Sequence, residues 1–274
     1  MVRAAWPAFL FAVLVVAAGC APDDEELSAV AARPGVPVAA PAAPAPPPGK
    51  AGSADGPPLG RATVTDPETA PYGSGRLGPW EGKGRELSTP EQFRTVAASD
   101  GVLMVGDSIA GATARECAAR FGAQHGLATA VNTWNSRPTA PAADWIVAHP
   151  ELIPGRGIVV VAGANDIFDP ADWWRQVERV VAAAAGKPVY WLTVHVDRWG
   201  MPADVRDADR QNSDWINDQL HWQAGRHPQL VLVDWQAVVA SDETTLLDDG
   251  VHPSVAGVDA WCGLVESALG LDSR

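Results

Sequence analysis

The sequence predicts an α/β protein whose globular part is a three-layer α/β/α sandwich around a parallel, five-stranded sheet in flavodoxin-like order. Short β-branched runs alternate with longer stretches of helical composition, and this alternation favours a parallel sheet with crossover helices. Polar motifs follow two of the apolar runs directly, where ligand-binding loops lie in open α/β sheets. The residues after about position 90 are numerous enough for one hydrophobic core.

The elements follow in order from these patterns. The apolar run at residues 102–105 (VLMV) predicts the first buried strand, and the Ala-rich residues 109–121 predict the helix after it. Residues 198–214 are polar and are expected to be a long loop beside the site that leads into a helix. The other strands are expected at 128–133, 158–162, 189–195 and 230–234, and the other helices at 171–185, 212–225 and 255–268.

The N-terminal residues 1–20 are expected to be a lipoprotein-type signal peptide. A charged start at Arg3 precedes an apolar stretch that is too short to span a bilayer comfortably. The sequence Ala-Ala-Gly-Cys at 17–20 has the form of a bacterial lipobox, with Cys20 as the lipidated residue. The alternative is an ordinary signal peptide cleaved nearby. Both interpretations predict export, and the first predicts anchoring to the outer face of the bacterial cell membrane.

Residues 21–90 are expected to form an Ala- and Pro-rich disordered tether, and residues 91–274 the domain. Proline at this density favours extended polyproline II, and the segment has too little apolar surface for a core. Tyr72, Leu77 and Trp80 either pack onto the domain or are disordered with the rest.

The charge of the domain excludes some partners. Residues 91–274 carry 24 acidic and 13 basic side chains, which is a poor composition for binding nucleic acid. The same charge repels strongly anionic substrates and favours neutral acylated sugars or small esters. No metal site is expected, because His195 and Asp197 have no third ligand at a suitable spacing.

Three short motifs supply the side chains that serine-ester chemistry needs: GDSI at 106–109, GAND at 163–166 and DGVH at 249–252. Ser108 is the expected nucleophile, His252 its base and Asp249 the carboxylate that holds the histidine tautomer. The Asn165 amide is an expected oxyanion donor. Asp248 is a rival to Asp249, but the three-residue spacing to His252 favours Asp249.

These motifs resemble the sequence blocks of the SGNH, or GDSL-type, hydrolase superfamily. Gly106-Asp107-Ser108 matches its first block, Gly163 and Asn165 its third, and Asp249 with His252 its fifth. The resemblance covers about residues 101–270 and is closest to extracytoplasmic domains of bacterial O-acyltransferases and acetylesterases. It implies a three-layer α/β/α fold and a Ser-His-Asp mechanism without a cofactor.

The resemblance also indicates the oxyanion hole. The second block of the family usually offers a glycine whose N–H is a donor, whereas residues 131–138 of this chain contain none. Ser136 stands at the expected position, and its backbone N–H serves without glycine unless φ is positive there. The expected oxyanion residues are therefore Ser108, Ser136, Gly163 and Asn165.

Two further expectations concern other residues. In the implied fold the helices that carry Cys117 and Cys262 pack side by side, so we predict a disulfide between them, two separate buried thiols being the alternative. His195, Asp197 and Trp134 lie near strand ends and are expected to contact substrate. Loop hydrogen bonding is the alternative for the first two, and core packing for Trp134.

The sequence therefore predicts an exported, monomeric serine esterase or O-acyltransferase. Its expected substrates are acyl esters, above all acetyl esters, of cell-wall or extracellular glycan, or small esters. The alternative is an SGNH-fold module that binds a glycan or a protein without turnover. The sequence does not decide between hydrolysis and transfer, and it does not give the acyl chain length or the acceptor.

Overall fold

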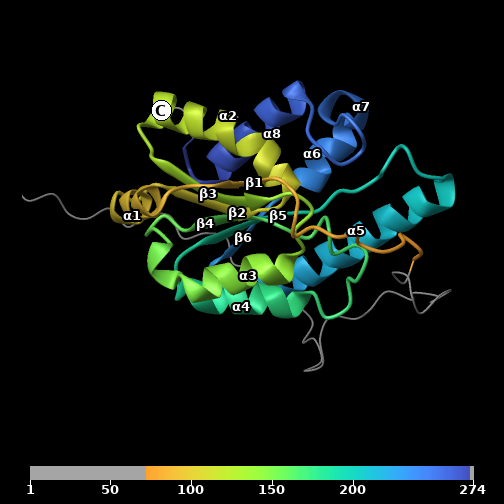
Figure 1. Cartoon of the computed structure of the whole chain (residues 1–274), viewed down its shortest axis with the longest axis horizontal. Helices are drawn as coiled ribbons and strands as arrows, with labels where there is room; N and C mark the ends of the chain where they lie inside the picture. The colour runs from red at the N-terminus through yellow and green to blue at the C-terminus, as the bar shows by residue number, and fades with distance from the viewer. Residues whose placement is uncertain (1–71, 272–274) are drawn as a thin grey trace, which may run out of the picture. The chain divides into compact units, whose positions relative to one another are not determined.

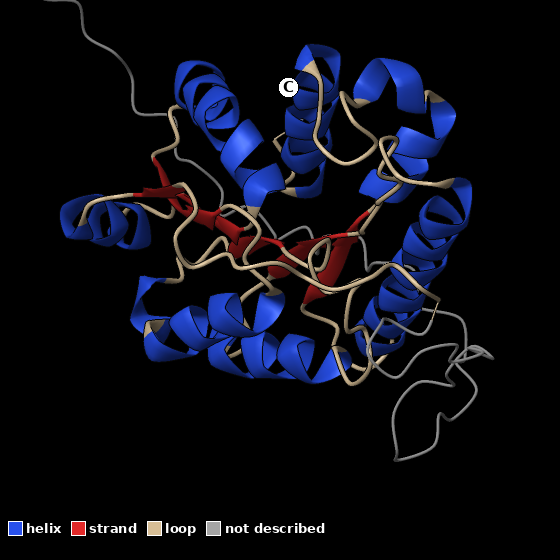
Figure 2. Cartoon of the chain, turned by 45° about the vertical axis from the view of Figure 1, so that its right-hand side comes forward, coloured by secondary structure: helices blue, strands red, loops and turns tan. Residues whose placement is uncertain are grey.

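The computed structural model describes residues 72–271. The predicted signal peptide, the lipidation site at Cys20 and most of the predicted tether lie outside the described residues. The described part consists of a twisted sheet between two layers of helices (Figures 1 and 2). In it, no helix combines the length and apolar character that crossing a membrane requires.

Five strands of the sheet run parallel in the order β3-β2-β4-β5-β6, which confirms the predicted flavodoxin-like arrangement. A sixth, antiparallel strand, β1 (Arg85–Leu87), pairs with β3 at the edge, so the prediction of five strands was wrong by one. This strand is short and largely exposed, and no apolar run marks it. The parallel strands are β2 (Val102–Gly106), β3 (Thr129–Trp134), β4 (Ile158–Val161), β5 (Val189–Leu192) and β6 (Leu230–Val233).

The helices form the two outer layers (Figure 1). One face of the sheet is covered by α2 (Ser108–His125), α6 (Trp235–Ser241), α7 (Glu243–Leu246) and α8 (Val255–Ala268). The opposite face is covered by α3 (Thr139–Ala148), α4 (Trp174–Ala184) and α5 (Ala203–Ala224). The helix α1 (Pro90–Ala98) and the 3-10 turn η1 (Pro150–Leu152) complete the described part.

The helix α5 corrects the expectation of a long loop at 198–214, because it begins at Ala203. Its buried face mixes polar and apolar side chains, and before Asn212 only Ala208 and Asp209 are buried, so apolar periodicity does not reveal where the helix begins. Asn217 on this face accepts a hydrogen bond from the Val194 N–H and donates to the Val194 carbonyl, at 2.7 and 2.8 Å. Such side chains stabilise the end of β5 by hydrogen bonding in place of apolar packing.

The predicted disulfide is present. Cys117 on α2 and Cys262 on α8 are bonded, with a Cα–Cα distance of 5.2 Å, and both are fully buried. The bond joins neighbouring helices on one face of the sheet, as the resemblance implied.

Residues 72–88, which we call the N-terminal arm, pack onto the domain. Tyr72 lies edge-on to Trp215, and Trp80 edge-on to Trp134, with centroid distances of 6.2 and 4.9 Å. Ser74 is 2% exposed and accepts hydrogen bonds from Asn212 and Arg198. The folded part therefore begins well before the predicted boundary at residue 91.

Candidate active site

The predicted nucleophile stands at a tight strand-to-helix turn. Ser108 is the first residue of α2, and Asp107 caps that helix by accepting a 2.9 Å hydrogen bond from the Ile109 N–H. Gly106 allows the close approach, because a Cβ there would lie 2.4 Å from the Val161 carbonyl oxygen. The Ser108 N–H therefore belongs to a helix N-terminus, where backbone donors lack partners within the helix and favour negative charge.

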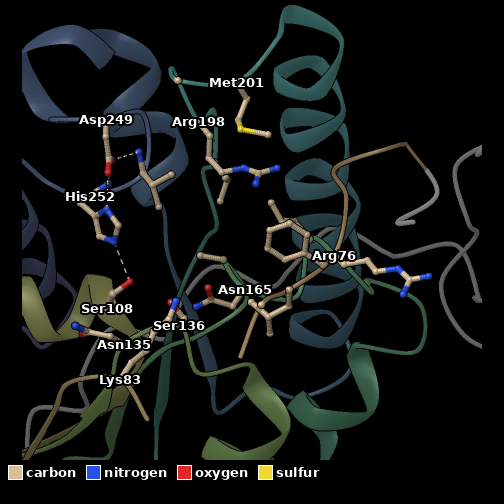
Figure 3. A pocket seen from close by; sticks show the side chains of 18 residues that line it. Arg76, Lys83, Ser108, Asn135, Ser136, Asn165, Arg198, Met201, Asp249 and His252 are labelled. Carbon is tan, nitrogen blue, oxygen red and sulfur yellow. Dashed lines mark hydrogen bonds and ion pairs between the residues drawn. The ribbon is translucent and has the colours of Figure 1, made fainter. Parts of the chain in front are cut away.

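The structure joins the three residues predicted for the triad. His252 Nε2 lies 2.9 Å from Ser108 Oγ, and His252 Nδ1 lies 2.8 Å from Asp249 Oδ2 (Figure 3). These are hydrogen-bond distances, and the order serine–histidine–carboxylate is the one that general-base activation requires. Asp248, the rival acid, contacts His252 through the backbone, because its N–H donates to the His252 carbonyl.

The charge on Asp249 is stabilised by its surroundings. Partial burial alone would raise the pKa of this carboxyl, but hydrogen bonds from the backbone N–H and ring of His252 outweigh burial and hold the pKa below its usual value. The Val251 N–H adds a further bond of 3.0 Å. An ionised Asp249 can therefore orient the His252 ring and stabilise its protonated form.

The loop that carries this pair is fixed to the loop after β5. The Asp197 N–H donates to the Gly250 carbonyl at 2.8 Å, and the Trp199 N–H donates to the Asp249 carbonyl at 3.0 Å. Gly250 has φ of +85°, and a Cβ there would lie 1.8 Å from the Asp197 carbonyl oxygen. Only glycine fits this approach, which sets the position of the acid and base.

Three of the four predicted oxyanion residues line one cavity with the triad: Ser108, Ser136 and Asn165. The Asn165 amide is oriented by bonds of 3.3 Å to Asp107 Oδ2 and to the Arg137 carbonyl. Gly163 lies outside the lining of that cavity. It has φ of +129°, and a Cβ there would be 2.6 Å from a methyl group of Val194, so its role is close packing.

Ser136 occupies a position that normally favours glycine. It has φ of +60°, in a turn closed by a 3.1 Å hydrogen bond from the Arg137 N–H to the Trp134 carbonyl. A positive φ at the third residue of a four-residue turn is typical of type II turns, which take glycine there. The left-handed conformation costs a residue with a side chain about 1–2 kcal/mol. A positive φ is the condition under which this position would need glycine, and the chain nevertheless has serine here.

Polar groups beneath the site connect its loops. Burial raises the pKa of Asp107 to about 6, against the lowering effect of the Ile109 N–H. Burial also raises the pKa of Asp166 to about 7, although Asp166 accepts hydrogen bonds from the Thr139 N–H and hydroxyl. Arg137 is 4% exposed and donates to the Gly106 carbonyl at 2.6 Å. These contacts link the loops after β2, β3 and β4.

The three predicted substrate contacts lie elsewhere. Asp197 is 2% exposed and forms ion pairs with Arg206 and Arg210, which outweigh its burial and lower its pKa. His195 Nε2 lies 3.3 Å from Glu243, and Trp134 packs against Trp80. None of the three lines the cavity at Ser108. Their places near strand ends correctly predicted the region of the sheet in which they lie. Their side chains, however, pack against or bond to other residues of the protein.

The cavity at Ser108 measures about 700 Å³. Its wall includes Arg76, Leu77 and Lys83 from the N-terminal arm, which sequence reasoning did not assign to the site. Arg198 and Met201 come from the loop after β5, which was expected beside the site (Figure 3). The aromatic and apolar residues near the end of the Pro-rich segment were the available signal for the arm. Within residues 72–271, no group of three or more His, Cys, Asp or Glu side chains is arranged to hold a metal ion.

No protein-family model and no curated protein matches this chain by sequence. Solved structures match its fold. A GDSL-like lipase from Bacteroides thetaiotaomicron aligns with a TM-score of 0.52 and 16% identity, covering 65% of this chain and 97% of that one. An alpha/beta hydrolase enzyme from the metagenome of Lake Arreo, Spain, gives a TM-score of 0.52 and 19% identity, covering 64% and 96%. The described part therefore has the fold of these hydrolases, which confirms the fold that the resemblance implied.

Proposed function

We propose that this chain is a serine esterase or O-acyltransferase that acts through an acyl-serine intermediate. The observation that carries the proposal is the hydrogen-bonded series Ser108–His252–Asp249 at the wall of an open cavity. A binding module has no chemical need for this series. The fold shared with a GDSL-like lipase supports the same class of reaction.

The geometry supports a two-step mechanism. Ser108 Oγ attacks the ester carbonyl while its proton passes to His252 Nε2, and Asp249 stabilises the imidazolium. The Ser108 and Ser136 backbone N–H groups bind the oxyanion, together with the Asn165 amide, which exchanges one of its two 3.3 Å hydrogen bonds for the oxyanion. Collapse expels the alcohol, which takes the proton from His252. Water, or a sugar hydroxyl, then attacks the acyl-serine with His252 again as the base.

Acetyl esters of cell-wall or extracellular glycan are the substrate class we propose. A cavity of about 700 Å³ has room for a sugar unit beside a small acyl group. Export and lipid anchoring through Cys20 complete the proposal, because they would place the domain at such a polymer.

The test is release of p-nitrophenol from p-nitrophenyl acetate by the full chain, beside Ser108→Ala and His252→Ala. Each variant should lose several orders of magnitude in kcat. The exposed residues Ser241 and His221 lie outside the cavity, so Ser241→Ala and His221→Ala are matched controls that should retain the full rate. Equal, near-background rates in all five proteins, without labelling of Ser108 by a phosphonate probe, would favour the binding module.

The same assay distinguishes hydrolysis from acyl transfer. Adding a glycan acceptor to a transferase should raise p-nitrophenol release and yield an acetylated glycan, whereas a hydrolase should yield acetate alone.

A further inference from the structure

We propose that Lys83, on the N-terminal arm, is a positioning residue that holds Ser136 in the conformation from which its backbone N–H donates to the oxyanion. The proposal rests on the serine-ester function proposed above. It assigns a role in the reaction to a segment outside the motifs that define the site.

The register of the edge strand delivers this lysine. β1 pairs with β3 so that Arg85 lies opposite Trp134. One residue beyond this pair, where the two segments continue side by side, the Asn135 N–H donates to the Gly84 carbonyl at 2.8 Å. The next step brings Lys83 to Ser136, and Lys83 Nζ donates to Ser136 Oγ at 2.8 Å. The sheet edge thus joins two residues that are 53 positions apart in sequence.

The conformation of Ser136 needs such a partner. Its φ of +60° is unfavourable for a residue with a Cβ, and glycine is the residue that a turn of this type takes at this position. The hydrogen bond from Lys83 holds the serine side chain and so restrains the turn. The adjacent Arg137 carbonyl accepts from the Asn165 amide at 3.3 Å, so a shift of the turn would disturb two of the three oxyanion donors.

A different role for Lys83 would be a direct effect of its charge on the substrate. Such an effect is consistent with the charges present, because Asp249 is the one carboxylate among the described residues that line the cavity and could offset the charge of Lys83. The two roles differ in what glycine at position 136 would do. Glycine adopts positive φ freely and has no hydroxyl for the lysine to hold. A positioning lysine would then become dispensable, whereas a lysine that acts by charge would still be needed.

The experiment is a double-mutant cycle in the full chain with p-nitrophenyl acetate, using Lys83→Met, Ser136→Gly and the double variant. We expect Lys83→Met to lower kcat by roughly 10-fold with KM changed less than about twofold, because an oxyanion donor acts in the transition state. Ser136→Gly should retain most of the activity. In the glycine background, Lys83→Met should cost less than about twofold.

Arg94→Met is the matched control, since it removes an exposed cation on α1 that lies outside the cavity, and it should leave kcat unchanged. Melting temperatures of all variants check that folding is retained. The affinity of phenylboronic acid provides a second measurement, because Ser108 Oγ bonds to boron, its proton passes to His252, and the adduct is tetrahedral and anionic. This affinity should fall with kcat in Lys83→Met and stay unchanged on adding Lys83→Met to the glycine variant.

An equal loss from Lys83→Met in both backgrounds, or no loss in the serine background, would overturn the positioning role while leaving the esterase intact. A wild-type chain without Ser108-dependent turnover would overturn the proposed function and the role of Lys83 with it. The two failures are therefore distinguished by the wild-type protein alone.

Discussion

Asp249 contacts His252 through both carboxylate oxygens: Oδ2 lies 2.8 Å from ring Nδ1, and Oδ1 accepts from the His252 backbone N–H, also at 2.8 Å. One side chain thus fixes the tautomer of the base and the backbone from which the base extends. The three-residue spacing of the motif makes this double contact possible, because acid and base share one short loop.

Replacing Asp249 by asparagine should preserve the loop and disable the base. An amide oxygen can still accept from the backbone N–H groups, but its NH₂ would face Nδ1 and favour the tautomer that cannot accept the Ser108 proton. We expect kcat to fall by about 10³–10⁴-fold with little change in KM. Asp248→Asn is the matched control, and steady-state kinetics that showed the larger loss there would reverse the assignment of the acid.

Gly250→Ala should inactivate the enzyme without unfolding it. The added Cβ would lie 1.8 Å from the Asp197 carbonyl oxygen, so the loop of Asp249 and His252 must move. Displacement of catalytic groups by about 1 Å costs on the order of 10²-fold in rate. The measurements are kcat and the circular-dichroism spectrum. Gly122→Ala is the control and should keep its rate, because an added Cβ on this part of α2 makes only an ordinary 3.8 Å contact with the Leu127 carbonyl oxygen, outside the cavity.

Asp166 should make stability depend on pH. Its pKa of about 7 in the folded protein lies above the usual value of 3.8. The folded state therefore binds this proton more tightly than the unfolded state, and the resulting stability is full below about pH 4 and is lost as the pH rises through about 7. Asp166→Asn lacks this dependence. Between pH 4.5 and 8 the melting temperature of the wild type should fall relative to the variant, by roughly 10 °C. A constant difference would show that Asp166 titrates at its ordinary pKa.

The Cys117–Cys262 bond should contribute to stability more than to chemistry. It links residues that are 145 positions apart. Closing so long a loop lowers the conformational entropy of the unfolded chain, which raises the free energy of unfolding by about 3–5 kcal/mol. The double variant Cys117→Ala, Cys262→Ala should unfold at a lower temperature yet keep kcat at 25 °C. A reducing agent should lower the melting temperature of the wild type and leave that of the variant unchanged. Equal melting temperatures for wild type and variant would contradict the prediction.

The sequence predicted the parts of the molecule that apolar runs and motif order encode. All five parallel strands lie at the expected positions, and Ser108, Asn165, Asp249 and His252 meet at one cavity. The first turns of α5, residues 203–211, were missed because their buried side chains are Ala208 and Asp209, and Asp209 is stabilised by hydrogen bonds from Arg198 that only the folded structure reveals.

The cavity wall was the least predictable part. Lys83 and Arg76 lie in a segment whose composition indicates a linker, and the position of Lys83 depends on the pairing of β1 with β3, a contact between residues far apart in sequence. His195 and Asp197 show the opposite error. A polar residue at a strand end satisfies the pattern for a substrate contact. His195 instead forms a hydrogen bond with Glu243, and Asp197 forms an ion pair with Arg206, both partners lying on helices that the pattern did not include.

The N-terminal arm affects how any shortened version of this protein should be made. A truncation at residue 91, where the composition changes, would remove β1, Lys83 and the Trp80 contact together. Such a protein could retain its triad and disulfide, melt cooperatively and still turn over slowly, because one side of its cavity would be missing. It would then be mistaken for a natural binding module, so the shortest reliable version starts upstream of Tyr72.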